Sequence, residues 1–447
     1  MKTSPFYAAP SQHLLRCPFT ACSFLSPFTG FEKMANLCTV FIVSPLSSFA
    51  SFSPRYNQAS AFRGPQNQAV SKRPRRPVKA AFTRCSHASA IPPAPSKRNA
   101  PTGSPLHSLE TGTWFKLICG ASSHDAPSIR NLCAVYTAVG VDCIDVACDL
   151  AIVRAARKGI AEGIMRRQSS HSPFLMVSVN AGTDPHFRKA SFAPSACPPE
   201  CRRPCEKVCP ADAIDLSGVI IDLCYGCGRC VPVCPPDIIR TLEYQHDPRF
   251  VSAVLEDVDA VEIHVGRGQE AEFRELWMQI GDVASRLKVV AVSLPDLGGD
   301  AALAAGLQSM WDVMKTHVSD TGNGPRLIWQ ADGRPMSGDI GRGTAKAAVF
   351  LGKRVREALN VARIPGEVQL AGGTNDATVP LMQANGLRRV GHATTSESFG
   401  GIAVGGYARK IQQEALKDVC GSDGNLSSQD FEKAYQAAKT LVDGIKA

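Results

Sequence analysis

The sequence predicts an α/β protein: a (β/α)8 barrel-like domain that carries a small cysteine-rich insert after its third strand and follows a disordered leader. Three observations support this prediction. Short apolar runs alternate with amphipathic stretches, eight cysteines fall within 38 residues, and the first 109 residues differ in composition from the rest. Of the 447 residues, 44% are hydrophobic and 20% charged, so most of the chain is able to bury a core.

The leader is basic and rich in Ser and Pro. Up to residue 109 it contains thirteen Lys or Arg but a single acidic residue, Glu32. This composition is typical of a transit peptide, and the Ser and Pro content favours the plastid over the mitochondrion. We therefore expect a chloroplast (stroma) protein in which residues 1–110 form a transit peptide and disordered linker. Met34 is an alternative translation start, and folded protein should begin near Thr111.

Without the leader, the remaining 36 basic and 39 acidic residues change the net charge from +9 to about −3. The run "KRPRRPVK" at 72–79 is also compatible with nucleic-acid binding or nuclear targeting. It lies, however, in Pro-rich text without interleaved aromatic residues, which favours the transit peptide. No stretch is long and apolar enough to span a bilayer. We expect no nucleic-acid partner and no transmembrane segment.

Eight strands alternate with helical patterns, as a parallel sheet covered by helices requires. The helical patterns include 126–140 and 343–359. An open doubly wound sheet is the alternative to a barrel, but it usually has fewer strands and often a Gly-rich turn after the first one. Here the first turn reads "CGASSHDAP". The predicted strands are 115–119, 142–147, 174–179, 260–265, 289–294, 326–331, 368–372 and 401–405.

The cysteine-rich insert separates the barrel text into 111–181 and 246–440. It covers 182–245, after the third strand, where a plain barrel has a single helix. The βα loops of a barrel all open on the face at the carboxyl ends of the strands. We therefore expect the insert to stand at the barrel mouth.

The second cysteine run, "CYGCGRCVPVCP" at 224–235, has the C-x2-C-x2-C-x3-C-P spacing of two-cluster ferredoxins, in which the fourth cysteine binds the other cluster. Gly226 and Gly228 give its loop the freedom to wrap a cluster. The spacing predicts a 2[4Fe-4S] ferredoxin-like insert. One cluster is expected on Cys209, Cys224, Cys227 and Cys230, and the other on Cys197, Cys201, Cys205 and Cys234.

The first run, "CPPECRRPCEKVCP" at 197–210, has the slacker spacing C-x3-C-x3-C-x3-C-P. Its cluster can therefore be [4Fe-4S] or [3Fe-4S]. Tetrahedral zinc sites are the structural alternative for both runs, but two terminal Cys-Pro steps favour iron–sulfur. Arg202, Arg203 and Arg229 lie inside the ligand loops, where they either raise the cluster potentials or are only solvated.

Four segments together resemble the LdpA (light-dependent period) family of cyanobacteria and its plastid relatives: "KLICGASSHDAPSIRNLCAVYTAVGVDCIDVACD", "CPPECRRPCEKVCPADAI", "CYGCGRCVPVCP" and "GGIAVGGYARK". The resemblance covers about 112–440. It implies an iron–sulfur protein that reports photosynthetic redox state to the circadian input pathway, with redox or signalling proteins of the plastid as partners.

The barrel itself has a candidate ligand site. "LAGGTND" at 370–376 and "GGIAVGGYARK" at 400–410 end the seventh and eighth strands, where many barrels bind phosphate. FMN or another phosphate-bearing ligand would then be held there, although the glycines can also serve helix packing alone. The predicted cofactor-binding residues are Gly372, Gly373, Gly405, Gly406 and Arg409.

Other polar residues and cysteines are weaker candidates. Asn180, His264 and Asp332 fall near carboxyl ends of strands, but each alone is more often structural. No Ser/His/Asp order, HExxH motif or Walker loop is present, so the sequence assigns no catalytic residue. We expect four further cysteines to pack as small apolar residues, with a redox-active thiol pair as the alternative: Cys119, Cys133, Cys143 and Cys148.

Two classes of function remain open at this point. The first is a redox sensor or electron relay, and the second is a flavin-type oxidoreductase whose clusters pass electrons to a ligand in the barrel. They differ in whether the barrel mouth holds a ligand.

Overall fold

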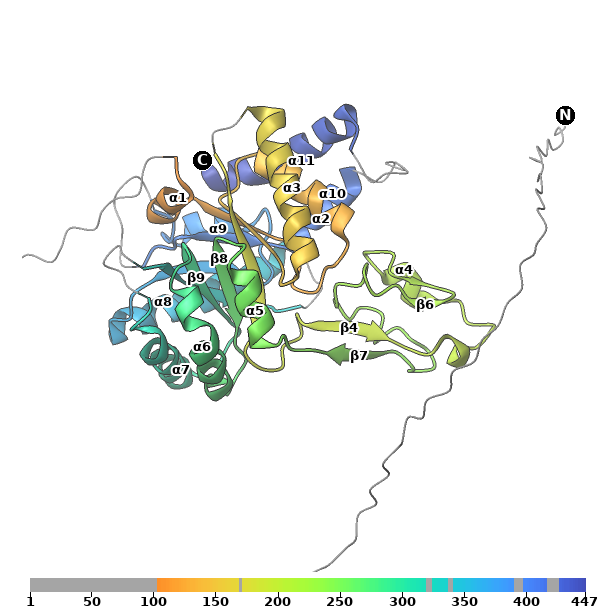
Figure 1. Cartoon of the computed structure of the whole chain (residues 1–447), viewed down its shortest axis with the longest axis horizontal. Coiled ribbons are helices and arrows are strands. Elements are labelled where there is room, and N and C mark those ends of the chain that lie inside the picture. Colours follow the sequence, from red (N-terminus) through yellow and green to blue (C-terminus); the bar gives the residue numbers. More distant parts are fainter. Residues whose placement is uncertain (1–102, 169–170, 319–323, 337–340, 390–396, 416–425) are drawn as a thin grey trace, which may run out of the picture. The chain divides into compact units, whose positions relative to one another are not determined.

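The structure is a computed structural model and describes residues 103–168, 171–318, 324–336, 341–389, 397–415 and 426–447. Eight parallel strands close into a barrel in the order β1, β12, β11, β10, β9, β8, β3, β2. Helices surround the strands (Figure 1). The strand bounds are β1 Trp114–Ile118, β2 Cys143–Ala147, β3 Phe174–Asn180, β8 Ala260–His264, β9 Val289–Leu294, β10 Arg326–Asp332, β11 Glu367–Ala371 and β12 Gly401–Val404.

The predicted barrel is confirmed, because each of the eight expected strands is present within two residues of its predicted ends. The open-sheet alternative is wrong, since Trp114 of β1 pairs with Gly401 of β12 and closes the ring. The register also aligns Asn180 with His264, and His264 with Ser293. The carboxyl ends of β3, β8 and β9 therefore reach the same rim.

Polar side chains cap the amino-terminal ends of several barrel helices. Asp125 accepts a hydrogen bond from the Ser128 N–H at the start of α2, and Asp149 does the same for Ala151 in α3. The apolar core lies between the strands and these helices. The helix bounds are α2 Ala126–Ala138, α3 Leu150–Arg167, α5 Pro248–Leu255, α6 Glu270–Ala284, α7 Asp300–Met314, α8 Ala345–Ala362, α9 Thr378–Ala384 and α10 Gly406–Ala415, with the 3-10 turn η2 at Arg342–Thr344.

A further helix, α1 (Pro105–Thr111), precedes the barrel. Leu109 is buried in a cluster with Trp114 and Met176, and its carbonyl accepts a hydrogen bond from Arg389. The expectation that folded protein begins near Thr111 is therefore wrong by a few residues. This helix was not predicted because the surrounding sequence is rich in Ser and Pro, although Ser104 caps its amino-terminal end. The rest of the predicted leader, residues 1–102, lies outside the described residues.

The cysteine-rich insert follows β3, as predicted, and leads into α5, the helix that a plain barrel would have there. Its two longer strands, β4 (Arg188–Ser191) and β7 (Arg240–Glu243), are antiparallel. The Ser122 hydroxyl of the first βα loop donates to the His186 carbonyl at 2.6 Å and so ties the insert to the barrel. The remaining elements are η1 Pro194–Ala196, α4 Pro204–Val208, β5 Ile214–Asp215 and β6 Gly218–Val219.

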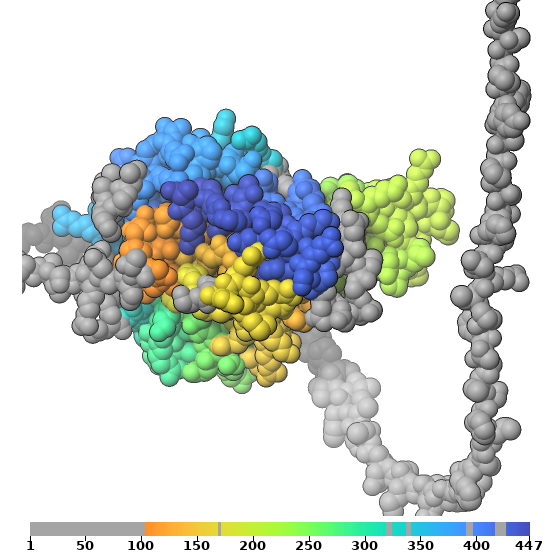
Figure 2. Space-filling model, turned by 90° about the horizontal axis from the view of Figure 1, so that it is seen from above, coloured from red at the N-terminus to blue at the C-terminus, as the bar shows by residue number. Residues whose placement is uncertain are grey.

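The chain ends in α11 (Ser428–Lys446), which continues past residue 440, the expected end of the domain. Arg167 of α3 pairs with Glu432 at 2.6 Å and lies 3.5 Å from the ring centroid of Tyr435. Figure 2 shows α11, in dark blue, beside the yellow α3. None of the helices in the described ranges has the length and hydrophobicity needed to cross a membrane.

Candidate functional site

The insert brings four thiols around one narrow cavity. These are the four predicted for one cluster, and they are called the inner group here: Cys209, Cys224, Cys227 and Cys230. Cys224 and Cys230 are buried, whereas Cys209 and Cys227 are partly buried. Cys209 comes from a segment separate from the other three, so the fold brings together the four cysteines that the sequence predicts for one cluster.

Backbone groups support the inner group. The Ala190 N–H donates to the Cys224 sulfur at 3.4 Å, and the Ala213 N–H donates to the Cys209 sulfur at 3.2 Å. Gly226 has φ +73°, and a Cβ there would lie 2.2 Å from the Arg188 carbonyl oxygen. Only glycine fits this position without strain. N–H donors of this kind stabilise thiolates and tune iron–sulfur clusters.

The other four thiols form a second set, called the outer group: Cys197, Cys201, Cys205 and Cys234. Cys205 is close enough to Cys234 for the two thiols to interact electrostatically, and Cys197 interacts in the same way with Cys201 and Cys205. The Arg203 N–H donates to the Cys201 sulfur at 3.4 Å. A surface cleft beside this group is lined by Arg202, Lys207 and several prolines.

In the described part of the chain, no three of the eight thiols lie within 4.8 Å of one another. Sulfur ligands of one tetrahedral zinc ion are about 3.8 Å apart, because the Zn–S bond is about 2.3 Å. Thiols, inward N–H groups and a cavity between them fit a cluster of several iron atoms.

A second and larger cavity, the mouth cavity, opens at the carboxyl ends of the barrel strands and has a volume of about 500 Å³. Pro210, Tyr225 and Cys227 of the insert line it together with barrel residues. The insert therefore stands at the barrel mouth, as the topology predicts, and Cys227 borders both cavities. All five residues predicted to bind a phosphate ligand line the mouth cavity: Gly372, Gly373, Gly405, Gly406 and Arg409.

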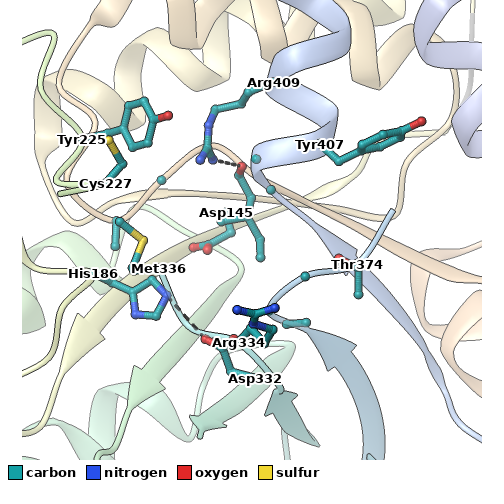
Figure 3. Close-up of a pocket in the computed structure, with 18 of the residues that line it drawn as sticks. Asp145, His186, Tyr225, Cys227, Asp332, Arg334, Met336, Thr374, Tyr407 and Arg409 are labelled. Atoms are coloured by element: carbon teal, nitrogen blue, oxygen red, sulfur yellow. Dashed lines mark hydrogen bonds and ion pairs between the residues drawn. The ribbon is translucent and has the colours of Figure 1, made fainter. Parts of the chain in front are cut away.

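Arg409 connects the barrel to the insert. Its Nη1 donates to the Ile118 carbonyl at 2.8 Å, and its guanidinium carbon lies 4.7 Å from the centroid of the Tyr225 ring. Figure 3 shows Arg409 and Tyr225 together at the rim of the cavity. From the sequence, Arg409 was predicted only to contact a phosphate-bearing ligand. In the structure its side chain also contacts Tyr225, in the loop of the inner group.

The floor of the mouth cavity is charged, which the strand patterns did not predict. Lys116 and Glu262, both buried, form an ion pair inside the barrel, and Gln330 donates to Glu262 at 2.7 Å. Burial raises the pKa of Asp145 to about 7, against the attraction of Lys116. Burial alone would lower the pKa of His264, but the hydrogen bond to Glu262 and nearby carboxylates raise it to about 9.

Two residues of this region were missed from the sequence. Asp184 and His186 follow β3 and meet His264 at the rim of the cavity, and these three residues are called the mouth cluster. His186 Nε2 also lies 3.4 Å from Asp332 Oδ2. Their only sequence signal was a position just beyond the end of a strand, inside text assigned to the insert.

The remaining predicted residues are structural. Asn180 donates to the carbonyls of Gly182 and Tyr244 and so holds the two ends of the insert together. The four barrel cysteines that the structure describes are all buried and free, which confirms the prediction that they pack as apolar residues: Cys119, Cys133, Cys143 and Cys148. Burial raises the pKa of Cys148 to about 12, which disfavours the thiolate form at neutral pH.

These features define a class of protein: an α/β barrel whose mouth carries a ferredoxin-like, cysteine-lined insert suited to iron–sulfur clusters. Residues 197–245 match the LdpA Fe-S cluster-binding domain, and residues 253–444 match the Light dependent period A C-terminal domain. Light dependent period A from Synechococcus elongatus is 43% identical over 346 residues, which are 76% of this chain and 94% of that relative. The chain belongs to the light dependent period A family and is an iron–sulfur protein, as the sequence resemblance indicates.

Solved structures show weaker likeness. A chain assigned as fructose-1,6-biphosphate aldolase from Coccidioides immitis has a TM-score of 0.39 at 11% identity, with 76% of this chain and 92% of that chain covered. Tryptophan synthase from Mycobacterium tuberculosis has a TM-score of 0.34 at 11% identity, with 78% and 100% covered.

Proposed function

We propose that this chain is a plastid iron–sulfur protein that holds two [4Fe-4S] clusters and senses or relays photosynthetic redox state. The single observation that carries the proposal is the arrangement of eight thiols in two groups of four, one of which borders the barrel mouth. By likeness to its cyanobacterial relative, the proposal extends to the input of light into circadian timing.

Clusters of this type, when bound, supply one-electron oxidation and reduction. The chain provides the surroundings that tune such a change. Arg229 and Arg409 place positive charge near the inner group, which favours the more negative, reduced state. The outer group has Arg203 beside it, but Glu206 pairs with that arginine at 2.6 Å and offsets its charge. The two sites are therefore expected to differ in potential.

Iron and sulfide analysis of protein purified without oxygen tests the cofactor. We expect about eight iron and eight sulfide per chain if both clusters are cubanes. Cys227→Ala should remove about half of the iron, because only the inner group loses a ligand. Cys148→Ala is the matched control, since this buried thiol lies outside both groups, and it should keep all of the iron. A colourless preparation loaded with zinc would contradict the proposal.

Import into plastids is a separate part of the proposal and rests on the composition of the leader. A reporter fused to residues 1–102 should enter the chloroplast stroma, and a chain that starts at residue 103 should keep the thermal stability of the full chain. Retention of the reporter in the cytosol or nucleus contradicts this part alone.

A second candidate function is favoured by the mouth cavity, whose volume is within the range of small-molecule sites. In this alternative the chain is an oxidoreductase that binds FMN or another phosphate-bearing ligand against Gly372, Gly373, Gly405 and Gly406. Titration of the purified protein with FMN, followed by flavin fluorescence, tests it. We expect Arg409→Ala to weaken binding at least tenfold, while Lys353→Ala on the outer face of α8 leaves it unchanged. If the purified protein contains no flavin and binds none in the titration, the sensor or relay remains as the function.

A further inference from the structure

The mouth cluster contains side chains of the kind that bind metal ions, and the proposed function does not use them. Asp184 and His186 lie between β3 and β4, and His264 ends β8. One donor atom from each residue lies within 4.8 Å of the other two. Asp184 and His264 are buried, and the side chain of His186 is 17% exposed. The cluster is therefore a defined pocket of donors in the barrel rim.

The distances within the mouth cluster are close to those of a coordination shell. His186 Nδ1 lies 2.7 Å from Asp184 Oδ1, and His264 Nδ1 lies 3.8 Å from Asp184 Oδ2. The centroids of the two imidazole rings are 4.7 Å apart. Nitrogen and oxygen ligands of a tetrahedral ion are separated by about 3.4 Å, because their bonds to the metal are about 2.1 Å long. Small side-chain movements would bring these donors around one ion.

Asp332 places a further buried carboxylate beside the mouth cluster. Its residue is 4% exposed and lines the mouth cavity, and its Oδ2 lies 3.4 Å from His186 Nε2. Its Oδ1 is buried and has no hydrogen-bond partner. Figure 3 shows the carboxylate directed toward His186. A buried carboxylate oxygen without a partner is unfavourable, and a bound cation would satisfy it.

The residues behind the mouth cluster also match a metal site. His264 Nε2 lies 3.0 Å from Glu262 Oε1, which leaves Nδ1 on the side of Asp184. Histidine ligands commonly direct their second nitrogen to a carboxylate, which orients the ring. A Cβ at Gly372 would lie 1.7 Å from Asp332 Oδ1, so glycine is needed there to give the carboxylate room.

We propose that Asp184, His186 and His264, with Asp332 as a fourth donor, bind one divalent first-row transition-metal ion at the barrel mouth. Imidazole nitrogens combined with carboxylates suit Fe²⁺, Co²⁺ or Zn²⁺, whereas Mg²⁺ and Ca²⁺ prefer sites made of oxygen alone. The ion lies in the wall of the mouth cavity, so a molecule that enters the cavity can reach it. This site is separate from both thiol groups and does not depend on the proposed redox function.

Cobalt is the probe for the test, and the protein carries its full complement of iron so that the cluster thiols are occupied. Equilibrium dialysis against Co²⁺ without oxygen, followed by elemental analysis, should give one cobalt per chain in addition to unchanged iron. The melting temperature of the barrel should rise with Co²⁺ concentration, because the ion binds the folded state.

Variants locate the ion. His186→Ala should lose the bound cobalt and the thermal shift. Asp332→Asn keeps the shape of the side chain and should weaken cobalt binding at least tenfold, which guards against a variant that fails to fold. His317→Ala, three residues beyond the end of α7, is the matched control and should retain one cobalt per chain. The visible spectrum of the clusters should be the same in all of these proteins.

The proposal is overturned if the iron-loaded protein binds no cobalt, or if His186→Ala and Asp332→Asn bind it as tightly as the unchanged chain. Iron content is measured on the same samples, so failure of the metal site and failure of the cluster assignment are read separately.

Discussion

The barrel and the insert are stabilised in different ways. The barrel has a continuous apolar core between strands and helices, with large side chains such as Trp277 and Trp329 almost fully buried. The insert has seven buried core residues, and three of them are cysteines: Cys205, Cys224 and Cys230. A segment of this size with so small a core cannot gain enough from apolar burial alone. The barrel is therefore expected to fold by itself, whereas the insert depends on what its thiols bind.

Removal of iron should have the largest effect and should separate the two regions. Without clusters, we expect the amide hydrogens of 190–240 to exchange at least a hundredfold faster, because ligand binding and folding are coupled in small metal domains. The amides of β9 and β10 should keep their protection. Hydrogen exchange with mass spectrometry measures both, and equal loss of protection in barrel and insert would contradict the comparison.

Lys116→Met should have the next largest effect, and it acts on the barrel. The change removes the lysine partner of buried Glu262 and leaves it His264 as its remaining ionic partner, at 3.0 Å, so the free energy of unfolding should fall by about 3 kcal/mol. The double variant Lys116→Met with Glu262→Gln should recover part of the loss, because the buried carboxylate that lost its lysine is also removed. Denaturant unfolding followed by tryptophan fluorescence is the measurement, and the cluster spectrum in the folded protein should not change.

Gly226→Ala should have a smaller effect that is confined to the insert. The new Cβ would meet the Arg188 carbonyl, and φ +73° is unfavourable for alanine, so we expect a cost of about 2–4 kcal/mol and loss of the inner cluster's EPR signal. Gly268→Ala is the matched control, since Gly268 has φ +74° but no atom within 4 Å of the new Cβ. It should cost about 1 kcal/mol. Equal effects of the two variants would show that the close approach is unimportant.

The smallest effects are expected for charges near the thiol groups, and they sharpen the difference between the groups. Arg409→Ala removes positive charge beside the inner group and should lower that cluster's potential by some tens of millivolts, roughly 1 kcal/mol. Arg202→Ala should lower the outer potential by less, because this side chain is exposed and screened by salt. Potentiometric titration followed by EPR measures both, and a larger shift at Arg202 would contradict the assignment of inner and outer surroundings.

Most of the fold could be predicted from local sequence patterns. The eight strands were predictable because buried parallel strands are short apolar runs, and this property depends on neighbours along the chain. Helix α1 was missed for a related reason: its seven residues are too few for a periodic pattern, and its stability comes from burial of Leu109 under the barrel.

The candidate sites differ in the same way: one could be predicted from local spacing, and the other forms only in the tertiary structure. The eight candidate cluster cysteines could be selected from the sequence because cluster ligands lie a few residues apart and their spacing reflects the loop geometry. Asp184, His186, His264 and Asp332 come from three different strand ends, and only the closed ring brings them together. The same holds for Lys116 and Glu262, which lie 146 residues apart in sequence yet form one ion pair.

By itself, the sequence determined the succession of strands and helices along the chain, the position of the insert after the third strand, and which cysteines are candidate cluster ligands. Each of these depends on short-range sequence patterns. Only the tertiary structure decided that Arg409 contacts the loop of the inner group, that Cys227 borders two cavities, and that the barrel mouth holds a cluster of imidazoles and carboxylates. These contacts join residues far apart in sequence, and their free energy depends on closure of the barrel and exclusion of water, which no local pattern records.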